Sequence, residues 1–304
     1  MTEPAVGRFL VPEVLARIGN LELLARTVVE GFLSGLHRSP YRGRSIDFAE
    51  HRGYMPGDDI RRIDWRLFAR TDRFYIKEFE ADSNTDLISL LDVSRSMRFT
   101  SHSTTKLDYG RSLAACLAYL ARKQRDRVGL ITFDEDVVDF VPPSARNLTI
   151  VLHTLDRLDG SLDAGRKGEL RRPLRKTAEA CHRRSILVLI SDLYEDPRAV
   201  LDAVSLLSHR GSDLIVFHLL DPAELRLPSG QPAIYEDMEA GERIPVVPEE
   251  ARTRYVALVN EHIAGLARLL GESRIDYLQI DTSQPLDHAL LGYLSRRARL
   301  VRSR

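Results

Sequence analysis

The sequence predicts an α/β fold with a doubly wound, mostly parallel sheet, preceded by an N-terminal helical and β-rich extension. Short, continuous apolar runs, typical of strands buried on both faces, recur along the chain. Segments with helical apolar periodicity separate these runs, and such alternation indicates a parallel sheet. The expected strands cover residues 86–92, 127–133, 185–192, 213–219 and 275–280.

The segments between these strands complete the expected fold. Residues 137–141 predict a short edge strand closed by Pro142 and Pro143, because proline cannot donate to a strand ladder. Proline and glycine punctuate residues 222–247, which we expect to form a small hairpin insertion. Apolar spacing predicts helices near residues 106–123, 148–158, 169–182, 197–208, 249–270 and 285–298.

Upstream of the first strand, residues 1–82 are expected to form an N-terminal module and residues 83–304 the α/β domain. Apolar residues between 11 and 36 predict two helices interrupted at Gly19-Asn20, packed on their own domain or presented to a partner. The charged block from Ser45 to Trp65 favours a salt-bridged cluster around a turn at Pro56. A catalytic interpretation of its His51, Asp58 and Asp64 is the weaker alternative, because no nucleophile accompanies them.

Composition narrows the function classes. The 304-residue chain has 44 basic and 44 acidic residues, and this balance argues against nucleic acid as the main partner. Its two cysteines, Cys116 and Cys181, lie in helical apolar patterns without metal-type spacing, which predicts buried thiols in a reducing cytosol. No signal peptide and no apolar run long enough to span a bilayer is visible, so we expect a cytoplasmic protein.

Polar side chains follow the first buried strand at the point where it ends. Asp92 supplies a carboxylate, and Ser94 and Ser96 supply hydroxyls two and four residues later. Asp192 ends a second buried strand, and the carboxyl ends of parallel strands meet at one edge of a sheet. These hard oxygens suit Mg²⁺ or Mn²⁺. Alternatively, Asp92 caps the next element and the serines make turn hydrogen bonds.

These features resemble a known domain. The strand end Asp92-Val93-Ser94-Arg95-Ser96, the strand ending at Asp192 and the βα alternation resemble a von Willebrand factor A-type domain. In that domain an Asp-x-Ser-x-Ser motif, a middle-loop Thr and a later Asp form a metal-ion-dependent adhesion site. The upstream block resembles the signature of the bacterial DUF58 family, with Tyr54-Met55-Pro56-Gly57-Asp58-Asp59, Arg61, Ile63-Asp64-Trp65 and Ala69-Arg70.

The resemblance implies a metal site formed by Asp92, Ser94, Ser96 and Asp192, with Thr104 or Thr105 at its rim. One ligand departs from the family pattern, because the middle-loop Thr falls near Gly168, which has no side chain. Ser161 substitutes only if its loop folds back, whereas Arg166 and Lys167 would place positive charge near the ion and weaken the site. The predicted Mg²⁺ site is therefore weak, completed by water, or vestigial.

By resemblance, the protein is a non-enzymatic interaction module that acts with a MoxR-type AAA+ ATPase in assembly or maturation of a client protein. The alternative is a Mg²⁺-dependent phosphohydrolase with Asp92 as nucleophile. That chemistry requires an acid two residues later, where this chain has Ser94. No phosphate-binding glycine motif occurs. The basic C-terminal residues predict a solvated helix end rather than nucleic-acid binding.

Overall fold

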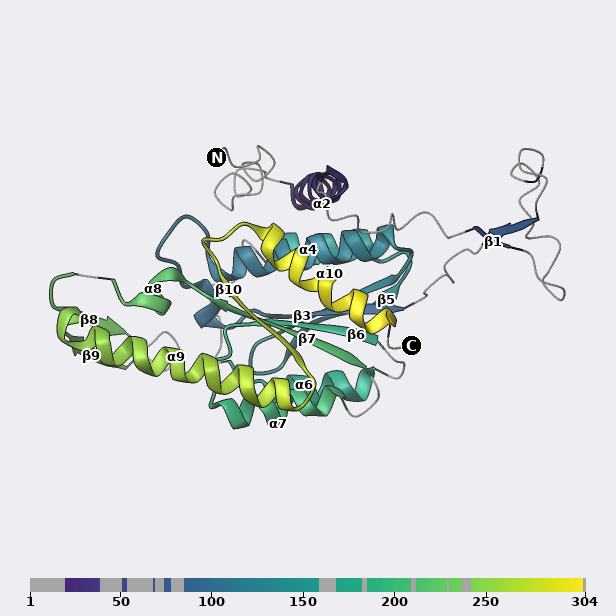
Figure 1. Cartoon of the computed structure of the whole chain (residues 1–304). Coiled ribbons are helices and arrows are strands. Elements are labelled where there is room, and N and C mark those ends of the chain that lie inside the picture. The colour runs from purple at the N-terminus through teal and green to yellow at the C-terminus, as the bar shows by residue number, and fades with distance from the viewer. Residues whose placement is uncertain are drawn as a thin grey trace.

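The computed structural model describes residues 20–38, 51–53, 68, 74–77, 85–158, 168–181, 185–208, 212–228, 230–236 and 242–302. A six-stranded sheet forms its centre (Figure 1), with strand order β10-β7-β6-β3-β4-β5. The strands are β3 (Asp86–Asp92), β4 (Arg127–Phe133), β5 (Val137–Ser144), β6 (Ser185–Ser191), β7 (Asp213–Leu220) and β10 (Asp276–Asp281). The doubly wound, mostly parallel α/β fold predicted from the sequence is confirmed.

The middle of the sheet is β3, which pairs in parallel with β4 on one side and β6 on the other. Every residue of β3 and β6 is buried, as their continuous apolar runs predict. Side chains of β3 alternate between the two faces, so Leu87 and Leu91 join one core while Ile88 and Leu90 join the other. The sheet therefore separates two hydrophobic cores.

Helices cover both faces of the sheet (Figure 1). The first core contains side chains of α2 (Leu21–Arg38), α4 (Lys106–Lys123), α5 (Leu148–Arg157) and α10 (Leu286–Arg302). The second contains side chains of α6 (Arg171–Ala180), α7 (Pro197–Ser208) and α9 (Pro248–Glu272). These helices match the segments expected from apolar spacing, with ends that differ by a few residues.

One edge of the sheet is β5, which runs antiparallel to β4 with register shifts between Val128 and Leu130 and between Thr132 and Phe133. The edge strand itself is confirmed, but it continues through Pro142 and Pro143 to Ser144, so the expectation that these prolines close it at residue 141 is wrong. An edge strand tolerates proline, which only lacks a donor for the ladder. At Gly129 the backbones approach closely, because a Cβ there would lie 2.9 Å from the carbonyl oxygen of Val141. The edge strand thus depends on a residue without a side chain.

In the N-terminal region, α2 begins after Asn20, whose side-chain oxygen accepts a hydrogen bond from the amide of Leu23 (2.9 Å). The apolar face of α2 packs against α4 within the first core, so this face is covered by the α/β domain. Two short strands, β1 (His51–Gly53) and β2 (Tyr75–Lys77), pair antiparallel. The division at residue 82 stays a prediction, and the Tyr54–Trp65 signature lies outside the described residues.

Between β7 and α9, the chain forms the short helix α8 (Pro222–Arg226) and then a hairpin of β8 (Ala233–Glu236) and β9 (Arg243–Val246). The hairpin was expected from the punctuation of residues 222–247, whereas α8 was not. Its placement directly after β7 brings α8 to the same sheet edge at which β3 and β6 end, and this position determines the site described next.

Candidate functional site

The candidate site lies at the carboxyl edge of the sheet, where β3 ends at Asp92 and β6 ends at Ser191. The carboxylate of Asp92 accepts hydrogen bonds from the Ser191 hydroxyl (2.6 Å) and the Ser94 amide (2.9 Å). The hydroxyls of Ser94 and Ser96 lie 3.2 Å apart, the latter in the short helix η3 (Arg95–Arg98). Turn hydrogen bonds therefore form in this loop, as one of the two sequence interpretations expects.

The four residues predicted as metal ligands are Asp92, Ser94, Ser96 and Asp192, and all four are buried. Burial, followed by the negative charge of Asp192, raises the pKa of Asp92 to about 7, against the opposing hydrogen bonds from Ser191 and Ser94. Asp192 directly follows Ser191, whose hydroxyl contacts Asp92, because β3 and β6 pair in parallel and end at the same edge. The structure thus brings together two acids that are distant in the sequence.

The site also contains a buried lysine. The side chain of Lys106, in the first turn of α4, is 0% exposed, and its Nζ lies 2.7 Å from Asp192 Oδ2 and 2.7 Å from Glu224 Oε1. The same nitrogen lies 3.3 Å from the hydroxyl of Tyr194 and 4.6 Å from the centre of its ring. We call Asp92, Ser94, Ser96, Ser191, Asp192, Lys106 and Glu224 the carboxyl-edge cluster.

Burial alone would lower the pKa of Lys106, but Asp192 and then Glu224 outweigh it, so its pKa is raised above the ordinary value. The ammonium is therefore charged at neutral pH. A buried ion pair of this kind contributes little by itself, whereas removal of one partner leaves an uncompensated charge that costs about 3–5 kcal/mol.

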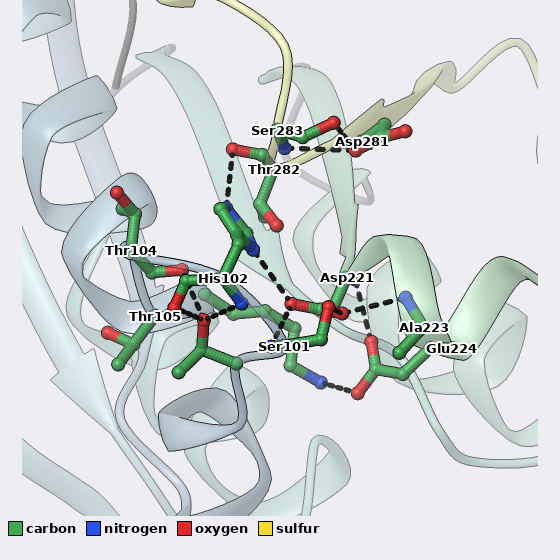
Figure 2. Close-up of polar contacts among 12 residues, drawn as sticks. Ser101, His102, Thr104, Thr105, Asp221, Ala223, Glu224, Asp281, Thr282 and Ser283 are labelled. Atoms are coloured by element: carbon green, nitrogen blue, oxygen red, sulfur yellow. Dashed lines mark hydrogen bonds and ion pairs between the residues drawn. The ribbon is translucent and has the colours of Figure 1, made fainter. Parts of the chain in front are cut away.

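The helix α8 supplies the second carboxylate and is capped by its own polar residues (Figure 2). Asp221 precedes α8 and accepts a hydrogen bond from the Ala223 amide (2.8 Å), while Glu224 accepts one from the Asp221 amide (2.8 Å). This capping box fixes the first turn of α8. It thereby holds Glu224 against the ammonium of Lys106.

Beside the cluster, Ser101, His102 and Asp221 supply the three residue types of a hydrolase triad, but their geometry is different (Figure 2). Both the Ser101 hydroxyl and Nδ1 of His102 contact the carboxylate of Asp221, the latter at 3.1 Å. The second ring nitrogen of His102 lies 3.4 Å from the carbonyl oxygen of Thr282. A triad requires the imidazole to accept the serine proton, and here these contacts instead tie the 100–104 loop to α8.

The fit of a divalent ion depends on Asp192. Asp92, Ser94 and Ser96 offer hard oxygen atoms, but Asp192 Oδ2 already accepts a hydrogen bond from the Lys106 ammonium. Two like unit charges 4 Å apart repel by about 4 kcal/mol at the effective dielectric of a protein surface, and Mg²⁺ doubles that charge. An ion that used all four predicted ligands would therefore lie beside the Lys106 ammonium, and this like charge opposes its binding. Within the described ranges, no three His, Cys, Asp or Glu residues cluster as a metal site.

The remaining predicted positions have varied outcomes. Thr105 caps α4, with its hydroxyl oxygen accepting from the Asp108 amide (2.9 Å), and Thr104 is buried beside it. Gly168 lies before α6, where the next amide, that of Glu169, donates to the carbonyl oxygen of Asp134. Ser161, Arg166, Lys167, Asp58 and Asp64 lie outside the described residues, as does the side chain of His51.

Sequence reasoning did not identify Lys106, Ser191, Asp221 or Glu224 as site residues. Two signals were available in the sequence. A lysine in the first turn of a helix opposes the helix dipole, which favours acidic residues there. Asp221 and Glu224 have the spacing of a capping box.

The fold and the site define the class first, which is an α/β protein with a mostly parallel six-stranded sheet and a buried polar cluster at its carboxyl edge. The chain matches the family described as "Protein of unknown function DUF58" over residues 50–265. This match covers more than half of the sequence, so the protein belongs to that family.

Relatives in mycobacteria are similar over most of the chain. "Uncharacterized protein Rv1480" of Mycobacterium tuberculosis (strain H37Rv) and "Uncharacterized protein Mb1516" of Mycobacterium bovis are each 28% identical over 233 residues. The match covers 76% of this chain and 72% of each relative.

Solved structures with partial similarity include an aerotolerance-related membrane protein of Bacteroides fragilis (TM-score 0.46, 18% identity, 67% of this chain and 96% of that one). BatB of Bacteroides thetaiotaomicron gives a TM-score of 0.44 at 17% identity, over 71% of this chain and 99% of its own. The SpRpn10 VWA domain gives 0.38 at 11% identity, over 68% and 93%. In the part of the chain that the structure describes, every helix is too short or too polar to cross a bilayer.

Proposed function

We propose that this protein is a non-enzymatic interaction module that binds a MoxR-type AAA+ ATPase at the carboxyl edge of its sheet. With that ATPase it acts in assembly or maturation of a client protein. The family membership supports the proposal, since the resemblance that led to it implies this partnership. The protein is placed in the cytoplasm by the same hypothesis, with no nucleic-acid partner.

The observation that carries the proposal is that the polar side chains at the carboxyl edge contact one another. The acids of the cluster contact an ammonium or a hydroxyl, and Ser101 and His102 beside it each contact the carboxylate of Asp221. A reaction centre requires a nucleophile within reach of its base. Because the charged side chains of this edge pair with each other within the chain, the edge is better suited to present a fixed surface to another protein.

The experiment is a binding measurement between the full chain and the MoxR-type ATPase of the same genome, with two charge-reversal variants. Arg95 is exposed at the carboxyl edge, in η3 between Ser94 and Ser96. Arg146 is also exposed but follows Ser144, which pairs with Val128 near the amino end of β4. We expect Arg95→Glu to weaken binding by about tenfold or more, and Arg146→Glu to leave it unchanged.

Equal affinity of wild type, Arg95→Glu and Arg146→Glu for the ATPase would exclude the carboxyl edge as the docking surface. The competing hypothesis is a Mg²⁺-dependent phosphohydrolase that uses Asp92. It is tested by incubating the protein with Mg²⁺ and an aryl phosphate. Turnover that Asp92→Asn abolishes would replace the interaction module with an enzyme.

A further inference from the structure

We propose that the ammonium of Lys106 is the resident cation of the carboxyl-edge cluster, so that the site works without a divalent metal ion. The inference rests on the proposed function and deepens it, because it states which cation holds the carboxylates of the docking edge in place. It also replaces the sequence-based expectation of Mg²⁺ or Mn²⁺ at Asp92, Ser94, Ser96 and Asp192.

The first support is the completeness of the contacts around Nζ. A lysine ammonium has three hydrogen-bond donors and no acceptor. Three oxygen atoms surround this one, from Asp192 at 2.7 Å, Glu224 at 2.7 Å and Tyr194 at 3.3 Å. Every donor therefore has an oxygen within reach, inside the folded chain itself.

The second support is the charge balance. Asp192 and Glu224 are two carboxylates that meet at one point, which is the arrangement that attracts a cation in a buried setting. The ammonium contacts both at equal distance, with an aromatic ring of Tyr194 over it. A divalent ion at Asp192 would have to displace this lysine or bind beside it.

The third support is that the residues of the cluster are buried from solvent. A metal ion that recruits a partner's acidic side chain keeps one coordination position open to it. Here Asp92, Ser94, Ser96, Asp192 and Lys106 are all buried. Tyr194, which is 52% exposed, packs its ring against the ammonium (4.6 Å from Nζ to the ring centre). The preceding Leu193 adopts a left-handed conformation (φ 50°) with its side chain buried. A residue other than glycine holds this conformation only where its surroundings enforce it.

The lysine is also fixed from the backbone side. Lys106 is the first residue of α4, and the cap at Thr105 sets the direction in which the helix starts. On the opposite side, the capping box of Asp221 and Glu224 sets the position of the carboxylate on α8. Two helix starts from distant parts of the sequence thus face each other across the ammonium.

The test measures metal binding by the isolated full-length protein, without any partner. Mn²⁺ is titrated by electron paramagnetic resonance, and Mg²⁺ and EDTA are compared by thermal unfolding. We expect wild type to show no saturable Mn²⁺ site at millimolar concentrations and no change in Tm with Mg²⁺ or EDTA. Lys106→Met removes the charge at similar length, and we expect it to bind Mn²⁺ at least about tenfold more tightly and to gain Tm with the ion.

Two further variants guard against misfolding and against surface binding. Lys106→Met/Glu224→Gln removes one of the two acids left unpaired and should retain the gain in a more stable fold. Lys106→Met/Asp192→Asn should lose the gain, because the released carboxylate is gone. A saturable Mn²⁺ site in wild type that Asp92→Asn abolishes would overturn the inference. A folded Lys106→Met/Glu224→Gln protein that gains no Mn²⁺ affinity would overturn it as well.

These results are separate from those that test the docking partner. An ATPase that fails to bind a metal-free wild type would contradict the proposed function alone. A wild type that binds both the ATPase and one Mn²⁺ through Asp92 would retain the function and overturn the lysine inference.

Discussion

His218 illustrates how burial changes the chemistry of a single residue. Its ring lies in β7 with 0% exposure, and its Nδ1 is 2.7 Å from the hydroxyl of Tyr277. Burial, followed by the nearby ring of His262, lowers the pKa of His218 to about 3. The folded protein therefore keeps this imidazole neutral in a pH range where an unfolded chain would protonate it.

This difference predicts a loss of stability in acid. Between pH 6.5 and about 3, His218 binds a proton in the unfolded state but not in the folded state. As the pH is lowered through this range, His218 therefore decreases the free energy of unfolding by about 1.4 kcal/mol per pH unit. Urea unfolding at pH 7 and pH 5 measures it. We expect His218→Leu to be less stable at pH 7 but to show a smaller drop towards pH 5. An equal decrease in the free energy of unfolding of wild type and His218→Leu between pH 7 and pH 5 would contradict the lowered pKa of His218.

At the same scale, the sequence predicts some site residues and not others for a physical reason. Asp92 and Asp192 were found because each ends a continuous apolar run, and strand ends share an edge. Lys106 was not, because an isolated lysine in a helix is expected to be solvated, and only the tertiary approach of Asp192 and Glu224 makes its burial favourable. These contacts join residues 86 and 118 positions apart, and no local pattern records them.

At the scale of the elements, the pairing of β4 with β5 depends on Gly129. A Cβ at this position would meet the carbonyl oxygen of Val141 at 2.9 Å and the nitrogen of Pro143 at 3.0 Å, both of them backbone atoms that move only with the strand. Gly31 in α2 is the contrasting case, since a Cβ there would have no atom within 4 Å.

The two glycines give opposite predictions for the same substitution. Gly129→Ala should lower the free energy of unfolding by about 1–3 kcal/mol, because it forces the two strands apart. Gly31→Ala should raise it by about 0.5–1 kcal/mol, because alanine favours the helix. Chemical denaturation of both variants measures the effects. Similar changes in the free energy of unfolding of the two variants would show that β5 can move away from β4 without a large loss of stability.

Short elements were harder to predict than long ones. The strands of the central sheet and the long helices follow from apolar runs and helical spacing, and α9 and α10 lie within a few residues of their expected ends. The five-residue helix α8 has no apolar stripe, and none of its residues is fully buried. Its only sequence signal is the capping box, which a search for periodicity does not detect.

At the scale of the whole molecule, α2 shares a core with elements far along the chain. Val28, Val29 and Phe32 are buried in the first core, together with side chains of α4 and α10. The periodicity of residues 11–36 predicts an amphipathic helix but leaves open which surface covers its apolar face. Side chains of α4 and α10, which lie far along the chain from α2, form that surface.

This packing predicts different effects for two large residues of α2. Phe32 is 5% exposed, so Phe32→Ala should lower the free energy of unfolding by about 3–5 kcal/mol. Leu23 is 54% exposed on the same helix, and Leu23→Ala should change stability by less than about 0.5 kcal/mol. Thermal unfolding of both variants decides the matter. A mild effect of Phe32→Ala would mean that α2 docks only weakly on the α/β domain.

The edge strand β5 affects the tendency of the protein to self-associate at high concentration. The side chains of Val138 and Phe140 in β5 are about half exposed. An exposed apolar edge strand can pair with a strand of another chain, and repeated pairing of this kind leads to fibrils. Two consecutive prolines in the same strand withhold the amide hydrogens that an incoming chain would need. Pairing of a further strand along β5 is thereby interrupted at Pro142 and Pro143, which disfavours self-association through this edge.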